Sequence, residues 1–573
     1  MKRTFFILTL FLLYTGLYAQ NIANKFRVTF TDKNNSPYSI SNPSQYLSQK
    51  ALDRRNRQNI SIQGNDIPVN SWYVDSIRNT GALVYTVSKW FNCVTIKTTD
   101  AAVITKILSF PFVAGIDTLA EQTAKKMEKG KKKKDTARGT QSFSGNNIDF
   151  FTQIQERSEQ TLPANANISD YGQAYTQAHM LGTDSLHSLG FRGENMTIAV
   201  LDAGFFKVDS NAVFDSLWIN DQILGTKDFV EPNGNVFDRS THGMMVLSIM
   251  GGNVPGKLIG TAPKAHYWLL RSEDANTEYP VEEDNWVCAA EFADSVGADI
   301  INSSLGYTVF YNSKWDHTYQ DMNGHTCRST LGADIAASKG ILVCNSAGNS
   351  GGGDWYYIGA PADADSIISV GAVDAQGKLA GFSSRGPSVD GRIKPTVCAM
   401  GEGTFVSTTT GSVMSGNGTS FSSPVLAGSV ACLWQANRGV SNMKIIQKVI
   451  ESSSRYYKPD TGFGYGIPNL IVANLILKGL TIDNFDEDNS INVFPNPFYS
   501  QLNLLFYSSD TSAIDIQIYD LSGRLVLSEE KISRTQGCNS IPIMSLDFLS
   551  KGYYLLKVFS TYRTYSVKVL KTQ

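Results

Sequence analysis

The sequence predicts an α/β domain with a mostly parallel sheet, preceded by a small α+β domain and followed by a small all-β sandwich. Between residues 168 and 477, short apolar runs alternate with helix-like stretches. Strands that are separated by helices form βαβ units, in which neighbouring strands run parallel. Before this region, strand-like runs mix with a helix-like stretch. After it, strand-like runs alternate with turn dipeptides.

The composition excludes several classes of protein. Of the 573 residues, 42% are hydrophobic and 18% are charged, which excludes a largely disordered chain. The net charge of −2 argues against a nucleic-acid binder. The sum nevertheless hides segments of opposite sign, because residues 1–120 carry +7, residues 121–138 carry +5 and the remainder carries −14.

The N-terminus predicts a signal peptide over residues 1–19. Met1-Lys2-Arg3 precedes an apolar run from Phe5 to Leu13, and Ala19 supplies a small residue at the cleavage site. A membrane anchor is the alternative, but the run is shorter than the ~20 apolar residues of a membrane span. No later segment is long and apolar enough to span a bilayer, so we expect an exported protein without a transmembrane segment.

Residues 20–120 predict the small α+β domain, and residues 121–167 a linker. Three runs are strand-like and one stretch is helix-like: Phe26–Phe30, Ala82–Val87, Cys93–Lys97 and Ala51–Arg57. The linker begins with seven lysines in residues 121–138, whose mutual repulsion disfavours folding. In an exported protein we interpret this run as a protease-accessible linker rather than a nucleic-acid tail.

The central and C-terminal regions show their elements more clearly. Central strands are expected at Thr197–Leu201, Asp299–Asn302, Ile341–Asn345 and Ile367–Val370, with helices at 282–296, 332–339 and 425–433. After a linker at 478–490, residues 491–573 predict the sandwich, with strands at Asp515–Tyr519, Arg524–Ser528, Tyr553–Phe559 and Thr564–Leu570.

The seven cysteines are widely spaced and form no Cys-x-x-Cys pair, which argues against a zinc ribbon. Cys344 and Cys432 lie in apolar runs and are expected to be buried core residues. Export permits disulfides, and Cys288 with Cys327 is a candidate pair.

Three short motifs of the central region supply the groups for acyl transfer. Asp202 ends an apolar strand, His242 lies in Thr-His-Gly, and Ser420 follows a glycine-rich turn at the start of an apolar helix. A serine hydroxyl needs an adjacent base, an imidazole can take its proton near neutral pH, and a buried carboxylate orients the imidazole. Each motif alone is more often structural. Their order, Asp then His then Ser, is the subtilisin order.

On these residues the sequence resembles the subtilisin-like serine endopeptidases, or subtilases, over residues 168–477. The resemblance implies a three-layer domain, a catalytic triad of Asp202, His242 and Ser420, and Asn349 in Ala-Gly-Asn as the side-chain donor to the oxyanion. Ser304, Leu305 and Gly306 resemble the segment that binds extended substrate. No cofactor is required for this chemistry.

Some positions depart from the family pattern. Residues that are common beside the three motifs are replaced here by Ala203, Met244, Phe421, Ser422 and Ser423, which weakens the hydrogen-bond support expected around His242. Family members often bind structural Ca²⁺, but the run 321–324 only partly resembles a calcium loop, and we interpret it as a polar turn. No metal ligand is assigned.

The flanking regions also resemble known domains. Residues 20–120 resemble a subtilase propeptide, which assists folding and inhibits the enzyme until the linker is cut. Residues 491–573, with Pro495-Asn496-Pro497 and a terminal Lys-Val-Leu-Lys, resemble the type IX secretion sorting domain of Bacteroidota. A substrate- or carbohydrate-binding module is the alternative for this sandwich.

Together these resemblances imply a self-inhibited endopeptidase, secreted or at the cell surface, exported across both membranes of a Bacteroidota-like bacterium. Its expected partners are protein or peptide substrates, its own propeptide and the type IX machinery, and no nucleic acid. Two alternatives come from other classes. A lipase or esterase would carry Gly-x-Ser-x-Gly with the order Ser, Asp, His, which the sequence lacks. A catalytically silent surface binding protein on a subtilase scaffold remains the second alternative, although no triad residue is missing.

Overall fold

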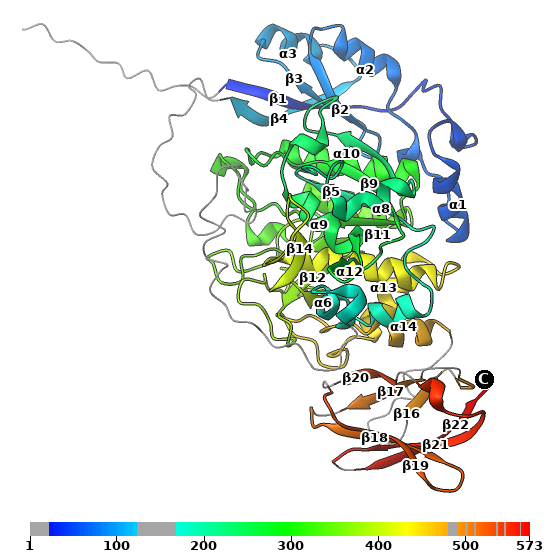
Figure 1. The fold of residues 1–573 in the computed structure, drawn as a ribbon. Helices are drawn as coiled ribbons and strands as arrows, with labels where there is room; N and C mark the ends of the chain where they lie inside the picture. Colours follow the sequence, from blue (N-terminus) through cyan, green and yellow to red (C-terminus); the bar gives the residue numbers. More distant parts are fainter. Residues whose placement is uncertain are drawn as a thin grey trace, which may run out of the picture.

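The computed structural model describes residues 22–122, 168–478 and, with short gaps, 491–572. The predicted signal peptide, nearly all of the linker 121–167 and all but the first residue of the linker 478–490 lie outside the described residues. The N-terminal domain (22–122) and the C-terminal domain (491–572) lie at opposite ends of the central domain (168–478), as Figure 1 shows.

The N-terminal domain is an antiparallel sheet with helices, which confirms the predicted α+β class. The strand order is β2-β3-β1-β4. These strands are β1 (Ile22–Phe30), β2 (Leu83–Ser88), β3 (Cys93–Lys97) and β4 (Val113–Gln122), and the helices are α1 (Gln49–Arg57), α2 (Ser71–Arg78) and α3 (Ala101–Leu108). Helices α2 and α3 pack on one face of the sheet around a core that includes Val28, Ile77 and Ile96.

The central domain contains a seven-stranded sheet in the order β13-β12-β11-β10-β5-β9-β6, and every pairing in it is parallel. The strands are β5 (Thr197–Asp202), β6 (Ile223–Asp228), β9 (His266–Arg271), β10 (Ile300–Ser303), β11 (Leu342–Ser346), β12 (Ile368–Val373) and β13 (Val397–Met400). The four predicted central strands correspond to β5, β10, β11 and β12. Because the strands are parallel, their carboxyl ends share one edge of the sheet, where ligands bind in open α/β sheets.

Helices cover both faces of this sheet and make a three-layer domain. Helices α9 (His242–Gly251), α12 (Thr419–Gln435), α13 (Asn442–Glu451) and α14 (Leu470–Leu477) share one hydrophobic cluster with it. Helices α10 (Val281–Val296) and α11 (Arg328–Ser338) share the other. The local sequence explains the bounds of α10. Three acidic residues in its first turn interact favourably with the positive end of the helix dipole, and Gly297 ends the helix in the left-handed conformation at φ 84°.

Shorter elements complete the central domain. They are α5 (Ile168–Tyr171), α6 (Tyr175–His179), α7 (Thr183–Ser188), α8 (Asp215–Ile219), β7 (Asn253–Val254), β8 (Leu258–Ile259), β14 (Thr404–Ser407) and β15 (Val413–Gly416).

The C-terminal domain is the predicted β-sandwich. Two antiparallel sheets, β16-β17-β20 and β19-β18-β21-β22, enclose a core that includes Leu504, Ile516 and Leu556. The strands are β16 (Ile491–Phe494), β17 (Leu502–Ser508), β18 (Ile514–Asp520), β19 (Leu525–Ile532), β20 (Gly537–Ile543), β21 (Gly552–Phe559) and β22 (Thr564–Lys571). Strand β20 lies beside α14 of the central domain.

The candidate disulfide is wrong. Cys288 on α10 and Cys327 before α11 are both buried and free, and they belong to separate hydrophobic clusters. Cys344 and Cys432 are buried core residues as expected. Among the described residues, no helix combines the length and the apolar character that crossing a membrane requires.

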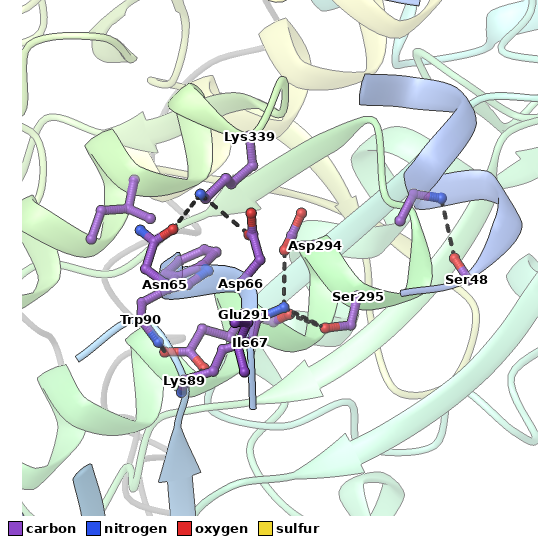
Figure 2. Close-up of polar contacts among 12 residues, drawn as sticks. Ser48, Asn65, Asp66, Ile67, Lys89, Trp90, Glu291, Asp294, Ser295 and Lys339 are labelled. Carbon is purple, nitrogen blue, oxygen red and sulfur yellow. Dashed lines mark hydrogen bonds and ion pairs between the residues drawn. The ribbon is translucent and has the colours of Figure 1, made fainter. Parts of the chain in front are cut away.

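The N-terminal domain docks on α10 through a buried polar network, and Figure 2 shows the part of it around Lys89, Glu291 and Asp294. Asp294 of α10 accepts from Arg54 at 2.5 Å, from Arg55 at 2.8 Å and from Lys89 at 3.1 Å. One turn earlier, Glu291 accepts from the backbone N–H groups of Lys89 and Trp90 and from the Ser88 hydroxyl.

Candidate active site

The carboxyl edge of the central sheet holds Asp202, the last residue of β5. Its side chain is fully buried, and Oδ1 accepts the backbone N–H of Ala203 at 2.7 Å. Strand β5 lies between β10 and β9, so Asp202 projects from the middle of the sheet edge. This position excludes water from the carboxylate and fixes its direction.

His242 begins α9 directly beside Asp202. The next residue must be small, because a Cβ on Gly243 would lie 2.4 Å from the carbonyl oxygen of Gly204 and 2.9 Å from Cβ of Asp202. The glycine of the Thr-His-Gly motif therefore has a packing reason, since it lets the helix start approach the strand end.

Asp202 and His242 form the pair that the sequence predicts. Nδ1 of His242 lies 2.8 Å from Oδ1 and 3.0 Å from Oδ2 of Asp202. Burial lowers the pKa of His242, but the charge of Asp202 and its hydrogen bond outweigh burial, so the pKa lies above its usual value. The arrangement holds the ring with Nδ1 toward the carboxylate and stabilises its protonated form.

Ser420 lies in the first turn of α12, after the N-cap Gly418 at φ 153°. Its hydroxyl donates to the carbonyl oxygen of Ser304 at 3.4 Å, and Ser304 Oγ donates to the carbonyl oxygen of Ser420 at 2.8 Å. The first-turn N–H groups of a helix lack intrahelical partners and lie at the positive end of its dipole. Negative charge beside Ser420 is therefore stabilised.

Asn349 is held in place by the residue that precedes Ser420. Its Oδ1 accepts the backbone N–H of Thr419 at 2.8 Å and the Thr419 hydroxyl at 2.9 Å. Because Oδ1 is engaged, the amide presents Nδ2 as its donor. Asn349 lines the same cleft as His242 and Ser420.

The three residues predicted to bind substrate also line this cleft. Ser304, Leu305 and Gly306 follow β10 and form part of its wall. An adjoining small pocket contains Trp355, while Asp354 and Tyr356 of the same loop are exposed. The structure thus brings six of the seven predicted site residues to one cleft, and the seventh, Asp202, lies buried and bonded to His242.

Sequence reasoning missed two features of the cleft. The ring of Phe421 lies 6.2 Å from that of His242, nearly parallel to it, so this departure from the family pattern places an aromatic side chain beside the imidazole. Glu273, Asp274 and Glu278 line a second part of the wall. The acidic run at 273–284 is visible in the sequence, but its place beside the motifs requires the fold.

The other departures are accommodated by packing. Met244 is buried in the core beneath α9, and the Ser423 hydroxyl donates to Asn302 of β10 at 2.9 Å. The hydrogen bonds between Asp202 and His242 are present with alanine at position 203.

Two groups of side chains within the described residues have metal-ligand chemistry. Glu283, His317 and Cys327 form one, and Glu273, Glu278 and Glu282 the other. In the first, Glu283 already accepts from His317 at 3.1 Å and from Ser329 at 2.8 Å. The carboxylate of Asp321, in the run compared with a calcium loop, accepts from Thr318. Calcium binding stays a prediction.

Comparisons with known proteins support the assignment of all three domains. Residues 193–466 match the subtilase family, residues 25–137 match the peptidase S8 propeptide domain of Bacteroidota, and residues 492–572 match the secretion system C-terminal sorting domain. The central domain belongs to the subtilase family. The subtilase domain thus spans the site residues from Asp202 to Ser420.

Curated relatives agree with this assignment. Subtilisin of Bacillus pumilus is 29% identical over 295 residues, which cover 50% of this chain and 94% of that protein. Subtilisin E of Bacillus subtilis is 29% identical, with 50% and 68% covered. A thermophilic serine proteinase of Bacillus sp. (strain AK1) is 30% identical over 273 residues, with 47% and 59% covered.

Among solved structures, MycP1 from the ESX-1 type VII secretion system is 22% identical, covers 55% of this chain and 88% of its own, and has a TM-score of 0.42. The prenylagaramide maturation protease PagA is 23% identical, with 52% and 99% covered and a TM-score of 0.42.

The matches establish the broad properties of the protein. It is a subtilisin-like serine endopeptidase with a propeptide domain and a sorting domain, and it is secreted or at the cell surface. The predicted domain boundaries stay predictions, as do the roles of individual site residues.

Proposed function

We propose that this endopeptidase cleaves protein or peptide substrates through an acyl-enzyme formed on Ser420. The main support is that Ser420 shares one cleft with a histidine whose Nδ1 is hydrogen-bonded to a buried aspartate. A base oriented in this way presents Nε2 to the nucleophile. Before it attacks the substrate, the Ser420 hydroxyl rotates away from the carbonyl oxygen of Ser304 and donates its hydrogen bond to Nε2 of His242.

The proposed reaction has two halves. Ser420 Oγ bonds to the scissile carbonyl carbon while His242 takes the hydroxyl proton, and His242 then returns a proton to the leaving amine as the C–N bond breaks. Water next attacks the ester, His242 again taking and returning a proton. Asp202 orients the ring and stabilises its charged form in both halves.

The oxyanion of each tetrahedral intermediate is stabilised by Nδ2 of Asn349 and by a backbone N–H in the first turn of α12. Thr419 supports both groups, because it fixes the Asn349 amide and belongs to that turn. Loss of one such donor lowers kcat by about 10²- to 10³-fold in enzymes of this chemistry. Ser304, Leu305 and Gly306 are the proposed contacts of the extended substrate.

The propeptide inhibits the enzyme before maturation in this proposal. Leu119 and Ala120, near the end of β4, pack against Val281 and Tyr279, which adjoin the acidic part of the cleft wall. The chain therefore leaves the propeptide at the edge of the cleft. Cleavage in the lysine-rich linker then separates the two domains, and the type IX machinery exports the protein.

The test compares the wild type with Ser420→Ala. Both full chains are clipped in residues 123–138 with an immobilised protease that is then removed, and casein hydrolysis is measured. We expect kcat to fall by about 10⁶-fold, because the nucleophile is lost. Ser412→Ala, an exposed serine outside the cleft, should keep wild-type activity.

Equal activity of the wild type and Ser420→Ala would refute the mechanism. Absence of any proteolysis by the clipped wild type would instead favour the catalytically silent binding protein.

A further inference from the structure

One part of the cleft wall carries more carboxyl groups than the proposed chemistry uses. Glu273 and Glu278 line the cleft together with His242 and Ser420, and Asp274 lies at their rim. Glu282, in the first turn of α10, lies behind them. Carboxylate oxygens of Glu273, Glu278 and Glu282 lie within 4.8 Å of one another, and the three residues are 4%, 8% and 0% exposed.

Neutral hydroxyls donate hydrogen bonds to two of these carboxyl groups. Tyr307 donates to Glu273 at 3.2 Å, and Thr277 donates to Glu282 at 2.8 Å. Within the described residues, Oε2 of the fully buried Glu282 accepts from no hydroxyl, N–H group or cation, and the Glu282 side chain is hydrogen-bonded to the carboxyl group of Glu273. A buried carboxylate oxygen in this state favours an added donor, and a cation most of all.

The pKa values of these carboxyl groups also reflect their burial close to one another. Burial raises the pKa of Glu273 and of Glu282 well above the usual value, and the neighbouring carboxylates raise both further. A cation that binds beside these carboxyl groups would favour their charged forms and so act against both shifts.

The propeptide already directs one cation toward this wall. Burial lowers the pKa of Lys25, and the charges of Asp274 and Glu282 act in the opposite direction, which places its ammonium within electrostatic reach of both. In the β1–β4 register Lys25 pairs with Ala120, and Ala120 packs on Val281, the residue before Glu282.

The direction of the chain shows which side of a substrate meets this wall. Strand β4 ends at Gln122 beside the wall, and the sequence continues Thr-Ala-Lys-Lys to Lys125 and Lys126. Three to four residues span at most about 10–14 Å. A peptide that continues in the direction of β4 passes the acidic wall before it reaches Ser420. Its residues at the wall therefore lie on the amino-terminal side of the scissile bond.

We propose that Glu273, Glu278 and Glu282, with Asp274 at the rim, form a subsite that selects a Lys or Arg side chain on the amino-terminal side of the scissile bond. This inference rests on the proposed function. It names the substrate class as peptides with a basic residue before the cleaved bond. The lysines after Gln122 make the protein's own linker such a peptide.

The subsite gives specificity through charge and desolvation together. A lysine ammonium donates charge-assisted hydrogen bonds to carboxylates that water reaches poorly, whereas an uncharged side chain of the same length supplies no such hydrogen bond. Discrimination therefore comes from stabilising the basic residue and from penalising its neutral analogue.

The test uses the mature enzyme and acylated tetrapeptide amides of aminocoumarin, which fix the scissile bond. Each of the four positions carries in turn Lys or norleucine, which has a similar chain without the ammonium. We expect kcat/KM to be at least about 10-fold higher for Lys at one position. A ratio near one or lower at all four positions would overturn the subsite.

Variants locate the effect. Glu278→Gln and Glu282→Gln should each lower the Lys-to-norleucine ratio at that position toward one. Asp221→Asn makes the same charge change at an exposed residue with φ 53°, a conformation that asparagine tolerates, and should keep the wild-type ratio. A high ratio that survives both glutamine variants would overturn the assignment to these residues.

Two further outcomes separate the explanations. An enzyme that cleaves Lys and norleucine peptides equally well refutes the subsite and leaves the protease intact, whereas cleavage of neither by clipped wild type refutes the proposed function as well. If the Lys preference is absent and Ca²⁺ raises the melting temperature of the wild type but not of Glu282→Gln, the carboxylates hold a divalent ion and the proposal fails.

Discussion

The two flanking domains meet the subtilase domain in different ways. Trp90 and Phe91 of the propeptide belong to the same hydrophobic cluster as α10 and α11, and Leu119 packs with Val281. The sorting domain is built around a cluster of its own, from Phe498 to Val569, and lies beside α14 through β20. The propeptide thus completes a layer of its partner, whereas the sorting domain has an independent core.

The polar contacts of the propeptide follow the same logic. Arg54 and Asp294 are both fully buried, and Arg54 also donates to carbonyl oxygens at the ends of α10 and α11. A helix end buried in this way needs partners, which the propeptide supplies while it is bound. The interface therefore resembles the interior of a single domain.

Deleting each flanking domain tests this contrast and should give the largest effect. Expression without residues 20–120 should lower the yield of folded enzyme by at least about 10-fold, because α10 loses its hydrophobic and charged partners. Expression without residues 479–573 should preserve the yield within about twofold, because the sandwich core is separate. Soluble yield and melting curves measure both.

An undiminished yield without residues 20–120 would contradict the folding role of the propeptide. A loss of folded enzyme on removal of residues 479–573 would contradict the independence of the sorting domain.

A single substitution should show how much the buried ion pair of Arg54 and Asp294 contributes to propeptide binding. Arg54→Ala leaves Asp294 buried with one cation fewer, and breaking a buried pair costs about 3–5 kcal/mol. The Kd of the separate propeptide for the Ser420→Ala enzyme should rise by about 10²- to 4 × 10³-fold. Titration calorimetry or fluorescence anisotropy measures the change.

Arg78→Ala is the matched control for that measurement. It breaks an exposed pair with Asp75 on the same domain, at 54% and 60% side-chain exposure. Exposed pairs contribute about 0–1 kcal/mol to stability, so Kd should change by less than about fivefold. Equal effects of Arg54→Ala and Arg78→Ala would show that burial does not decide the strength of this interface.

The smallest effect is expected from mild acid. Burial raises the pKa of Asp294, but Lys89, Arg54 and Arg55 outweigh burial and hold the pKa well below its usual range. A carboxyl group with a lowered pKa contributes its stabilisation above the pKa of the dissociated form and loses it only as the pH falls through the lowered value. Asp294 therefore stays charged at pH 5.

Lowering the pH from 7 to 5 should change the Kd of the propeptide by less than about threefold. Burial raises the pKa of Glu291 and of Asp284 in the complex, so protonation of these two groups favours association as the pH falls. A Kd that rises 10-fold or more at pH 5 would show that another group controls release.

Much of the protein follows from the sequence alone. The alternation of apolar strands and helices predicts the α/β domain with a parallel sheet, and turn dipeptides predict the sandwich, because periodicity and turn chemistry act over a few residues. The order of Asp202, His242 and Ser420 predicts that these residues share one site. Each motif is local, because it determines only its own strand end or helix start.

Only the tertiary structure decided the contacts between distant segments. Arg54 and Asp294 are 240 residues apart, and no local pattern relates them. The three carboxyl groups of the proposed subsite come from the segment after β9, a loop and the start of α10, and Phe421 reaches His242 from a neighbouring helix of the same layer. Such pairings depend on strand order and layer packing, which no short stretch of sequence encodes.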